Sequence, residues 1–314
     1  MFACCRANDG CCGAKDPGIN DMTKLTAADD SQNRDLPDNC EADTAPYTED
    51  DGNNRSTSYF DREIGELNHI KTNDVNVKNG TAYKFKSGAV YVGQWKNNMR
   101  NGYGTQSWPD GATYAGQWED NFATGNGRFT HSDGDIYIGR WSQNMASGLG
   151  IYYHKGSTTY SGEWENDLQS GYGVETWVEG ARYEGIFREG QKDGFGCYHW
   201  IDGSTYQGRW QDNVIDGPGT YLASDGRCFT GQWKESVLHG IGKYVWPGGR
   251  EYSGHYISDM KHGFGIFSWP DGRMYEGFWS NGKQCGQGRY TTKDGTTKTA
   301  YWQDGRRIKD ADEE

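Results

Sequence analysis

The sequence lacks any hydrophobic run that approaches the roughly 20 apolar residues needed to cross a bilayer. Its first residues also lack the apolar core of a secretory signal, so we expect a soluble, intracellular protein. Only 33% of the 314 residues are hydrophobic, and the mean hydropathy is -0.97. This composition excludes a thick buried core, whereas an aromatic content of 14% is too high for a disordered chain.

An excess of basic charge is also missing, because the formal net charge is -12. Residues 1–80 carry 16 acidic and 8 basic side chains, a net of -8, and the remaining 28 acidic and 24 basic side chains give -4. Phosphate binding depends on clustered Lys and Arg, so nucleic acid is not an expected partner. Simple electrostatic attraction to anionic lipid is weakened for the same reason.

Complete catalytic motifs are missing as well. The string from Gly277 to Lys283 resembles a phosphate-binding loop, but Gln284 follows it where Ser or Thr is required. The Gly-x-Gly pairs lack a third glycine and a βαβ context. Cys197 and His199 would share a strand face without a third orienting group. We therefore expect neither catalysis nor a cofactor.

The cysteines show no metal-binding spacing. Cys4, Cys5, Cys11 and Cys12 form two adjacent pairs, which do not suit a zinc site, and disulfides are rare in cytosolic proteins. Reversible S-palmitoylation is the remaining chemistry, and two or more acyl chains would anchor a protein stably. The alternative is an unmodified tail. Phe2 stands where N-myristoylation requires glycine, so that modification is not expected.

A strict repeat is the main feature that is present. All thirteen tryptophans fall in two columns of a 23-residue grid. The first column holds Trp95, Trp118, Trp141, Trp164, Trp210, Trp233, Trp279 and Trp302, with Phe187 and Tyr256 in its gaps, and the second holds Trp108, Trp177, Trp200, Trp246 and Trp269. Aromatic residues placed by period indicate a repeat protein that presents a long surface.

The spacing within each copy predicts the fold. Tyr91, Gly93 and Trp95 are alternate residues, which is the period of a strand with one aromatic face. The Asp-Gly pairs predict tight hairpin turns, and the polar segment after each Trp predicts a longer reverse connection. Both are too short for a parallel crossover. We expect an all-β, elongated, single-layer antiparallel meander of about twenty stacked strands.

The recurring glycines indicate close approach of aromatic rings. A strand glycine costs stability unless another group needs the space. We expect Gly93, Gly102 and Gly104, with their counterparts every 23 residues, to let the rings of adjacent strands lie flat on the sheet.

These units carry Tyr-x-Gly-x-Trp, then Gly-x-Gly, then Asp-Gly, and resemble MORN (membrane occupation and recognition nexus) repeats. Nine full copies run from Tyr91, and the resemblance covers roughly residues 81–307. Departures are confined to turns such as Gly156-Ser157 and to Lys298, which replaces the leading Tyr of a degenerate tenth copy. The resemblance implies a single-layer sheet of hairpins, used in membrane-associated, cytoskeletal and ciliary scaffolds and attached to phosphoinositide kinases.

The flanking segments differ from the array. Residues 1–57 predict a disordered acidic tail, residues 58–80 a linker or a short capping helix, residues 81–309 the repeat array, and residues 310–314 an acidic tail. Phe60, Ile64 and Leu67 have helical spacing, and Ser56, Thr57 or Ser58 is suited to capping the helix. Such a helix would cover the first open sheet edge.

The sequence therefore predicts a non-enzymatic scaffold or adaptor that links partner proteins to membrane or cortical cytoskeleton. A ciliary or axonemal component and a regulatory or targeting subunit for a phosphoinositide kinase are the alternatives. We expect a cytoplasmic location, at a membrane, the cell cortex or a cilium. Partners are proteins, with membrane lipid as a further contact, and the edge at residues 297–303 is a candidate for homodimerisation.

The aromatic columns are the candidate binding face, for lipid, a peptide or a partner helix. The alternative is that these rings only hold the sheet together. The candidate residues are Tyr91, Trp95, Tyr114, Trp118, Tyr137, Trp141, Tyr160, Trp164, Tyr206, Trp210, Trp233, Tyr252, Tyr275 and Trp279.

Overall fold

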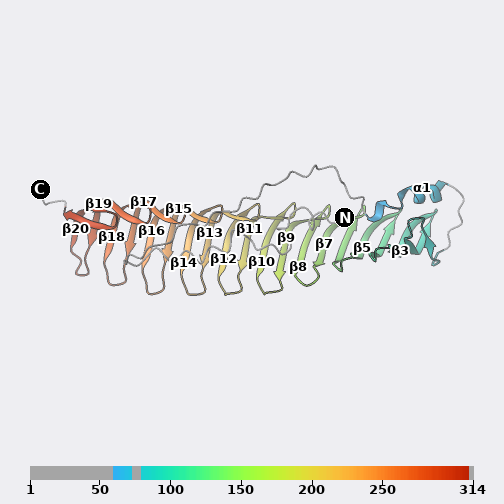
Figure 1. Cartoon of the computed structure of the whole chain (residues 1–314), viewed down its shortest axis with the longest axis horizontal. Helices are drawn as coiled ribbons and strands as arrows, with labels where there is room; N and C mark the ends of the chain where they lie inside the picture. The colour runs from blue at the N-terminus through green and yellow to red at the C-terminus, as the bar shows by residue number, and fades with distance from the viewer. Residues whose placement is uncertain (1–58, 73–78, 311–314) are drawn as a thin grey trace.

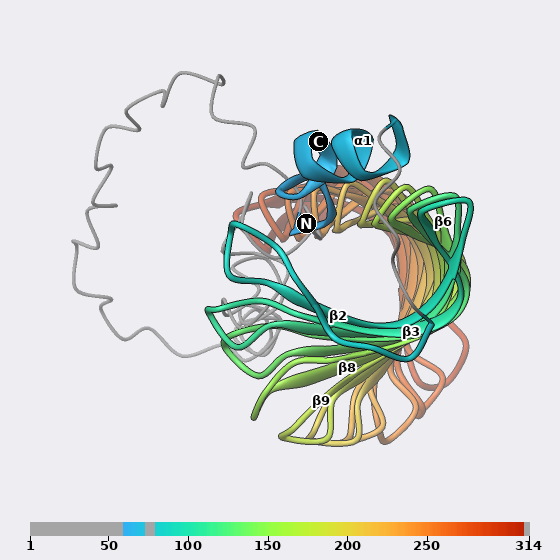
Figure 2. The ribbon, with the colours of Figure 1, turned by 90° about the vertical axis from the view of Figure 1, so that its right-hand side faces the viewer.

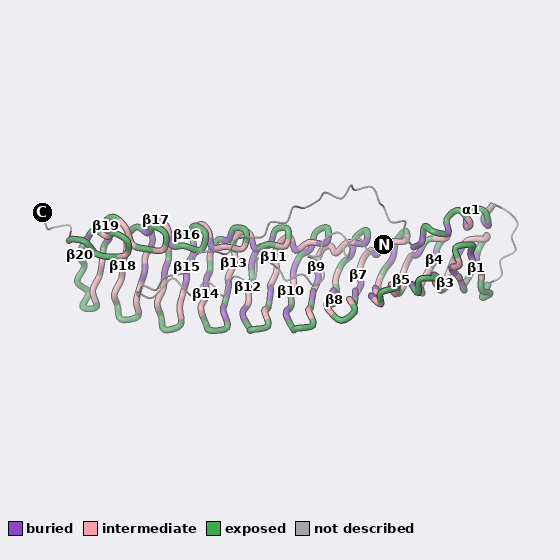
Figure 3. Tube along the Cα trace, viewed as in Figure 1, coloured by how far each residue is buried: buried purple, intermediate pink, exposed green. Residues whose placement is uncertain are grey.

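A single antiparallel sheet of 21 strands makes up nearly all of the computed structural model, which describes residues 59–72 and 79–310. Each strand pairs with its neighbours in the chain, so the sheet is a meander drawn out into a long ribbon (Figure 1). Exposed residues gather at the turns along both sides of the ribbon, and buried residues form stripes across the strands (Figure 3). The predicted all-β meander of stacked hairpins is confirmed.

Among the described residues, two helical elements precede the sheet, a 3₁₀ helix (Tyr59–Asp61) and α1 (Ile64–Thr72). Between β1 and β21, which are shorter, the strands alternate between about seven and nine residues. They are β1 (Tyr83–Lys84), β2 (Val90–Lys96), β3 (Met99–Ser107), β4 (Thr113–Glu119), β5 (Phe122–Thr130), β6 (Ile136–Ser142), β7 (Met145–Tyr153), β8 (Thr158–Glu165), β9 (Leu168–Trp177), β10 (Arg182–Arg188), β11 (Gln191–His199), β12 (Thr205–Gln211), β13 (Val214–Leu222), β14 (Cys228–Lys234), β15 (Val237–Val245), β16 (Glu251–Ile257), β17 (Met260–Ser268), β18 (Met274–Ser280), β19 (Lys283–Thr291), β20 (Thr297–Gln303) and β21 (Arg306–Asp310).

The two kinds of turn are the reverse of those expected. The segment after each Trp is the tight turn: Asn97 and Asn98 both have positive φ, 51° and 58°, as a two-residue type I′ hairpin requires. The Asp-Gly pair lies in the longer connection, where Gly111 has φ 93° and the Trp108 N–H donates to the Ala112 carbonyl at 2.9 Å. The prediction of which turn is tight was wrong because Asn and Asp adopt the left-handed conformation without glycine.

Where the second residue of a tight turn is Asn or Asp, its side chain also joins neighbouring hairpins. Asn121 Oδ1 accepts a hydrogen bond from the Arg100 N–H at 2.8 Å, 21 residues earlier in the chain. The same bond recurs where Ala123, Ala146, Lys192 and Leu238 donate to Asn144, Asp167, Asn213 and Asp259. These side chains hold successive repeats in register along one side of the ribbon.

The glycines support the tyrosine column. A Cβ on Gly93 or Gly104 would lie 2.4 or 2.2 Å from the Tyr91 hydroxyl oxygen, so the ring crosses both glycines as expected. Gly102 has a different role, because it has φ 77° and faces the Gln94 side chain. Neighbouring rings meet edge to face: Tyr91 makes an angle of 84° with Trp95 at a centroid distance of 5.1 Å.

The segment 59–72 lies on the aromatic face of the first repeats, where the curved sheet is open (Figure 2). Phe60, Leu67 and Ile70 are buried, whereas Ile64 is exposed. The helical spacing was therefore right for Phe60 and Leu67, and Ile70 takes the place expected for Ile64. The rings of the segment pack on the face of the sheet, and Glu63 and Glu66 also contact Ser87, Tyr83 and Lys86 in or beside the first strand. The predicted capping residues 56–58, the predicted tail 1–57 and residues 311–314 of the predicted tail 310–314 lie outside the described residues, whereas Asp310 is the last residue of β21.

The predicted dimer edge is not an edge. Strand β20 pairs with β19 on one side and with β21 on the other, so residues 297–303 have no free backbone edge. In the described part of the chain, β21 is the last strand, and it carries Arg306, Arg307 and Lys309. Charged side chains on an outer strand oppose edge-to-edge pairing.

Candidate binding face

The fourteen aromatic residues proposed for binding form the floor of the aromatic face. All are at most 8% exposed, and the tyrosines lie at 0 to 2%. Each tyrosine hydroxyl donates to a backbone carbonyl three residues on, as Tyr114 does to Gln117 at 2.9 Å. Burial is the main reason that the pKa of Tyr91 rises to about 12. These rings therefore stabilise the sheet. The side chains that would contact a ligand lie above them.

More accessible rings lie in the second tryptophan column. Trp177, Trp200, Trp246 and Trp269 are half-buried and pack on the buried floor. The sequence prediction did not name this column as a binding face. A signal was available, because each of these residues stands at the end of its strand, beside the longer connection, where rings cover it from fewer sides.

The segment 59–72 shows what the face accommodates. Phe60 is 3% exposed and lies among five rings, with centroid distances of 5.4 to 5.9 Å. These rings, here called the Phe60 site, are Trp108, Tyr114, Trp118, Phe129 and Trp141. Tyr59 packs beside it against Trp108 at 5.2 Å. Edge-to-face contacts of this kind add about 0.5–1.5 kcal/mol each beyond the area they bury.

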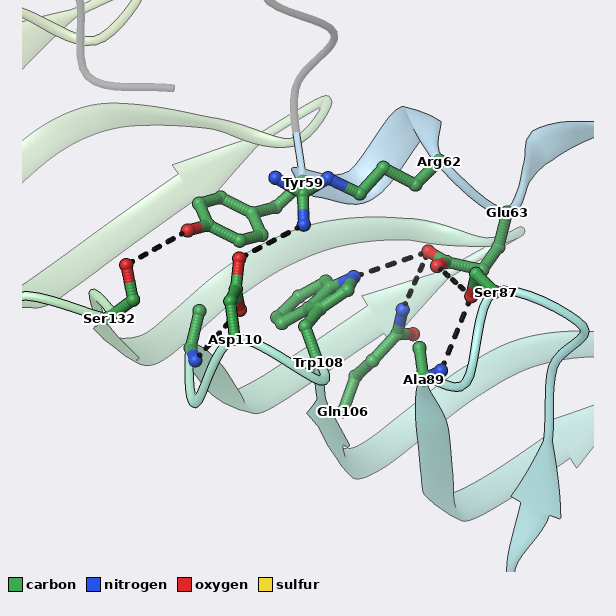
Figure 4. Close-up of polar contacts among 10 residues, drawn as sticks. Tyr59, Arg62, Glu63, Ser87, Ala89, Gln106, Trp108, Asp110 and Ser132 are labelled. Carbon is green, nitrogen blue, oxygen red and sulfur yellow. Dashed lines mark hydrogen bonds and ion pairs between the residues drawn. The ribbon is translucent and has the colours of Figure 1, made fainter.

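Glu63 supplies a buried carboxylate next to the Phe60 site (Figure 4). It accepts hydrogen bonds from Trp108 Nε1 at 3.3 Å, Gln106 Nε2 at 3.0 Å and Ser87 Oγ at 2.7 Å. A buried carboxylate is tolerated only with donors or a counter-charge. The indole and amide donors of the sheet therefore select an acidic residue at this point of the segment.

The counter-charge is Arg100, which is 1% exposed. Its guanidinium lies 4.0 Å from the centroid of the Trp118 ring, donates to the Asn121 carbonyl at 2.7 Å and contacts Gln106. Burial lowers the pKa of Arg100, and the charge of Glu63 opposes that shift. The sheet thus contributes the cation and the segment contributes the anion.

Two outer contacts fix the ends of the segment. Glu66 accepts hydrogen bonds from the Tyr83 hydroxyl at 3.0 Å and the Lys86 N–H at 2.8 Å. Burial and the bond to Glu66 raise the pKa of Tyr83 to about 12. At the other end, Arg62 pairs with Asp110 at 3.2 Å. The aromatic anchor is therefore flanked by polar contacts that set its register.

Two further cations lie on the aromatic face at positions equivalent to Arg100. The sequence analysis did not identify either of them. Lys192 is buried and pairs with Glu175 at 3.2 Å. Lys261 is buried among four rings, the nearest being Phe267 at 4.9 Å. In the sequence they can be recognised as basic residues at the repeat position of Arg100, which holds Ala, Gln, Ile or Leu in the other full copies.

The described residues offer little for catalysis. Cys197 Sγ lies 3.3 Å from His199 Nε2, but burial and the nearby charge of Glu184 raise the pKa of the thiol, which disfavours the thiolate. Across 59–72 and 79–310 no group of three or more His, Cys, Asp or Glu is placed to hold a metal ion. Cys4, Cys5, Cys11 and Cys12 lie outside those ranges.

The opposite, outer face carries a shallow open depression across β3 to β6. Glycine backbone and the side chains of Tyr103, Thr105, Arg128 and Ile138 line much of it, and its lining includes no carboxylate, histidine or cysteine. Within the described residues no helix is long and apolar enough to span a membrane. The aromatic face, on which Phe60 and Glu63 are seated, is the candidate functional site.

An open sheet of stacked 23-residue hairpins with a built aromatic face defines a β-hairpin repeat protein. The MORN repeat model matches nine consecutive segments, so the chain belongs to the MORN repeat family. The matched residues are 91–113, 114–136, 137–158, 160–182, 183–205, 206–226, 229–249, 252–272 and 275–297. No curated protein matches the chain by sequence.

Solved structures similar to the chain include three related domains. A mutant TCP10 domain of Danio rerio CPAP is 14% identical, with 65% of this chain and 96% of that chain covered and a TM-score of 0.37. The CPAP G-box domain is 15% identical, with 64% and 100% covered and a TM-score of 0.36. The Drosophila melanogaster SAS-4 (dCPAP) TCP domain, in complex with a proline-rich motif of Ana2 (dSTIL), is 13% identical, with 60% and 99% covered and a TM-score of 0.32. None reaches a TM-score of 0.5, so these likenesses carry no inference about this chain.

Proposed function

We propose that this chain is a non-enzymatic scaffold whose aromatic face holds segments of partner proteins and links them to membrane or cortical cytoskeleton. The observation that carries the proposal is the seating of Phe60 and Glu63. An amphipathic segment lies on this face with its ring among five aromatic side chains and its carboxylate on three donors. The face is thus suited to binding segments of this chemistry.

The segment covers only the first three of nine repeats. Farther along, Trp177, Trp200, Trp246 and Trp269 remain half-buried, and no described helix lies over these repeats (Figure 1). A line of partly exposed rings is typical of an interaction surface. An amphipathic segment that lays its apolar side on such a surface is a recurrent mode of recognition.

The test compares proteins that co-purify with the tagged full chain and with two variants, by quantitative mass spectrometry. The face variant carries Trp200→Ala and Trp246→Ala. The control carries Tyr103→Ala and Phe195→Ala, which also remove two aromatic rings, each 63% exposed on the outer face. We expect a defined set of proteins to be lost from the face variant alone. Identical sets from all three chains would contradict the proposal, provided that thermal melting shows the variants folded.

For the membrane link we propose acylation of the four N-terminal cysteines. Two or more thioester-linked chains suffice for stable anchoring. The experiment fractionates cells that express the full chain, a variant with Cys4, Cys5, Cys11 and Cys12 changed to Ser, and a chain that begins at Tyr59 and so keeps the seated segment. Loss of the membrane fraction in both variants, together with hydroxylamine-sensitive labelling of the full chain, is the expected result. Equal membrane fractions for all three would show that the repeats, and not the N-terminal cysteines, determine the localisation.

A further inference from the structure

We propose that the aromatic face has a second seat for an acidic aromatic segment, built around Lys261 and Trp269, and that its occupant is a segment of another protein. This inference rests on the proposed scaffold function and adds the place and the chemistry of binding. It follows from a repetition of the occupied seat 161 residues, or seven repeats, farther along the chain.

The rings of the Phe60 site recur almost unchanged after seven repeats. Four keep their residue type, and Phe129 becomes Tyr290. The equivalent rings, here called the Trp269 site, are Trp269, Tyr275, Trp279, Tyr290 and Trp302. Tyr83, which bonds to Glu66 at the first seat, corresponds to Tyr244. The second seat therefore has the rings that hold Phe60 and one of the two donors to the outer carboxylate, because Pro247, at the position of Lys86, has no N–H. Of the three donors to Glu63, the indole recurs as Trp269, whereas Phe267 and Gly248 stand at the positions of Gln106 and Ser87.

The geometry of the two sites agrees. In the Trp269 site the ring centroids of Tyr275 and Trp279 lie 5.4 Å apart, those of Tyr275 and Trp302 5.1 Å, and those of Tyr290 and Trp302 6.4 Å. The equivalent distances in the Phe60 site are 5.0, 5.1 and 6.1 Å, for the pairs Tyr114–Trp118, Tyr114–Trp141 and Phe129–Trp141. The same ring arrangement is thus present before any occupant arrives.

The buried cation recurs as well. Lys261 Nζ lies 5.6 Å from the Tyr252 ring and 5.2 Å from the Trp279 ring, the two rings equivalent to those over which Arg100 lies. A segment with the spacing of Phe60 and Glu63 would bring its carboxylate to Lys261 and to the indole N–H of Trp269. At the Lys192 position the sheet itself provides Glu175, so that position has a different preference.

The two sites differ in how deeply their rings are buried. Trp108, Phe129 and Trp141 are buried beneath the segment 59–72, whereas the equivalent Trp269, Tyr290 and Trp302 are half-buried. The difference in exposure is found at rings that contact the segment 59–72 in the first site. Covering them would remove apolar surface from water, at about 25 cal/mol per Å².

The occupant cannot be the segment 59–72 of the same chain. Residues 73–78 tie it to the sheet, and such a link extends at most about 25 Å. Seven repeats are fourteen strands, or about 67 Å at roughly 4.8 Å per strand. Upstream, the same ring-to-acid spacing occurs at Tyr47 and Asp50, thirteen residues before Phe60, and thirteen residues extend at most about 47 Å.

A second copy of the chain is disfavoured for a different reason. Its segment 59–72 is already seated on its own sheet, where the short connection keeps the effective concentration high. Transfer to another copy would expose one Phe60 site for each Trp269 site filled. The occupant is therefore a segment of a different protein, with a ring followed by carboxylates three and six residues later and an aliphatic residue at the seventh, as in Phe60, Glu63, Glu66 and Leu67.

A labelled synthetic peptide with the sequence of residues 58–72 is the probe, and its fluorescence anisotropy is measured against the full chain. We expect saturable binding that weakens roughly tenfold or more with Lys261→Met in the chain or with Glu63→Gln in the peptide. Lys261→Arg should keep binding, because the first seat uses arginine. Lys243→Met removes the same charge from a half-exposed site and should change nothing.

Absence of binding, or equal binding to the Lys261→Met chain, would overturn the inference. If the full chain instead forms dimers in sedimentation that Glu63→Gln abolishes, the occupant is a second copy, and the assignment to another protein is wrong. These results are separable from the scaffold proposal. Partners lost from the Trp200 and Trp246 variant would keep the scaffold even where the peptide fails to bind.

Discussion

The carboxylate of Glu63, carried by a segment outside the repeats, accepts a hydrogen bond from the indole nitrogen of Trp108 inside them, at 3.3 Å. Both side chains are buried, and the charge of Glu63 favours the charged form of the buried Arg100. The relation joins two parts of the chain that are 45 residues apart. It makes the first repeats and the segment 59–72 one unit of stability.

Glu63→Gln should loosen that unit. Glutamine keeps the shape of the side chain but leaves Arg100 buried without its counter-charge. The cost of breaking such a contact is about 2–4 kcal/mol. Hydrogen exchange should show faster exchange of the amides in 59–72 and in β2 to β4, with repeats beyond β9 unchanged. Glu66→Gln, at a half-exposed residue, is the matched control and should have a much smaller effect.

Gly104→Ala should destabilise the array through the tyrosine column. The added Cβ would lie 2.2 Å from the hydroxyl oxygen of Tyr91, which is fully buried and cannot move aside. Overpacking of this kind costs about 1–3 kcal/mol. Gly65→Ala in α1 is the control, because nothing lies within 4 Å of its Cβ position, and it should stabilise the helix by up to about 1 kcal/mol. Equal thermal melting of both variants would refute this account.

The period of the sequence predicted the sheet because each copy repeats the same local constraints. Tyr91, Gly93 and Trp95 alternate, and alternation fixes both strand and face. The turns were misassigned because Asn97 and Asn98 adopt positive φ without a glycine to mark them. A single glycine in a longer loop is the stronger sequence signal but marks the less tight connection.

The binding face was harder to predict than the sheet. Periodicity shows which rings share a face but not how deeply each lies, and the tyrosine column is buried by its own neighbours. The role of Glu63 was missed because its partners, Gln106 and Trp108, are more than 40 residues away. Only the folded structure brings Glu63 of the segment 59–72 against Trp108 of the repeats.

Two tryptophans of the same column should respond differently to phenylalanine. Trp279 Nε1 donates to the Gly265 carbonyl at 3.2 Å, whereas Trp233 Nε1 is buried and has no acceptor among the described residues. Trp279→Phe therefore loses a hydrogen bond, and Trp233→Phe removes an unpaired donor. Urea denaturation should show a loss of free energy of unfolding that is about 1 kcal/mol greater for Trp279→Phe. A larger loss at Trp233 would contradict the assignment.

Asp167→Asn should stabilise the chain in a pH-dependent way. Asp167 is buried at a tight turn, where burial raises its pKa to about 6, although the Ala146 N–H donates to its Oδ1. The folded state therefore binds a proton that the unfolded state releases near pH 4, so stability falls as the pH rises from about 4 to 6. Above that window the ionised carboxylate costs up to about 3 kcal/mol.

Asparagine occupies the equivalent turn position at Asn121, Asn144 and Asn213 and accepts the same backbone hydrogen bond. The substitution thus keeps the acceptor and removes the ionisation. Urea denaturation should show the variant more stable by about 2–3 kcal/mol at pH 7.5, with the difference shrinking to less than about 1 kcal/mol near pH 4. Asp212→Asn, at an exposed turn residue, is the control for replacing a turn carboxylate. A constant difference between Asp167→Asn and the natural chain at both pH values would show that ionisation of Asp167 is not the cause.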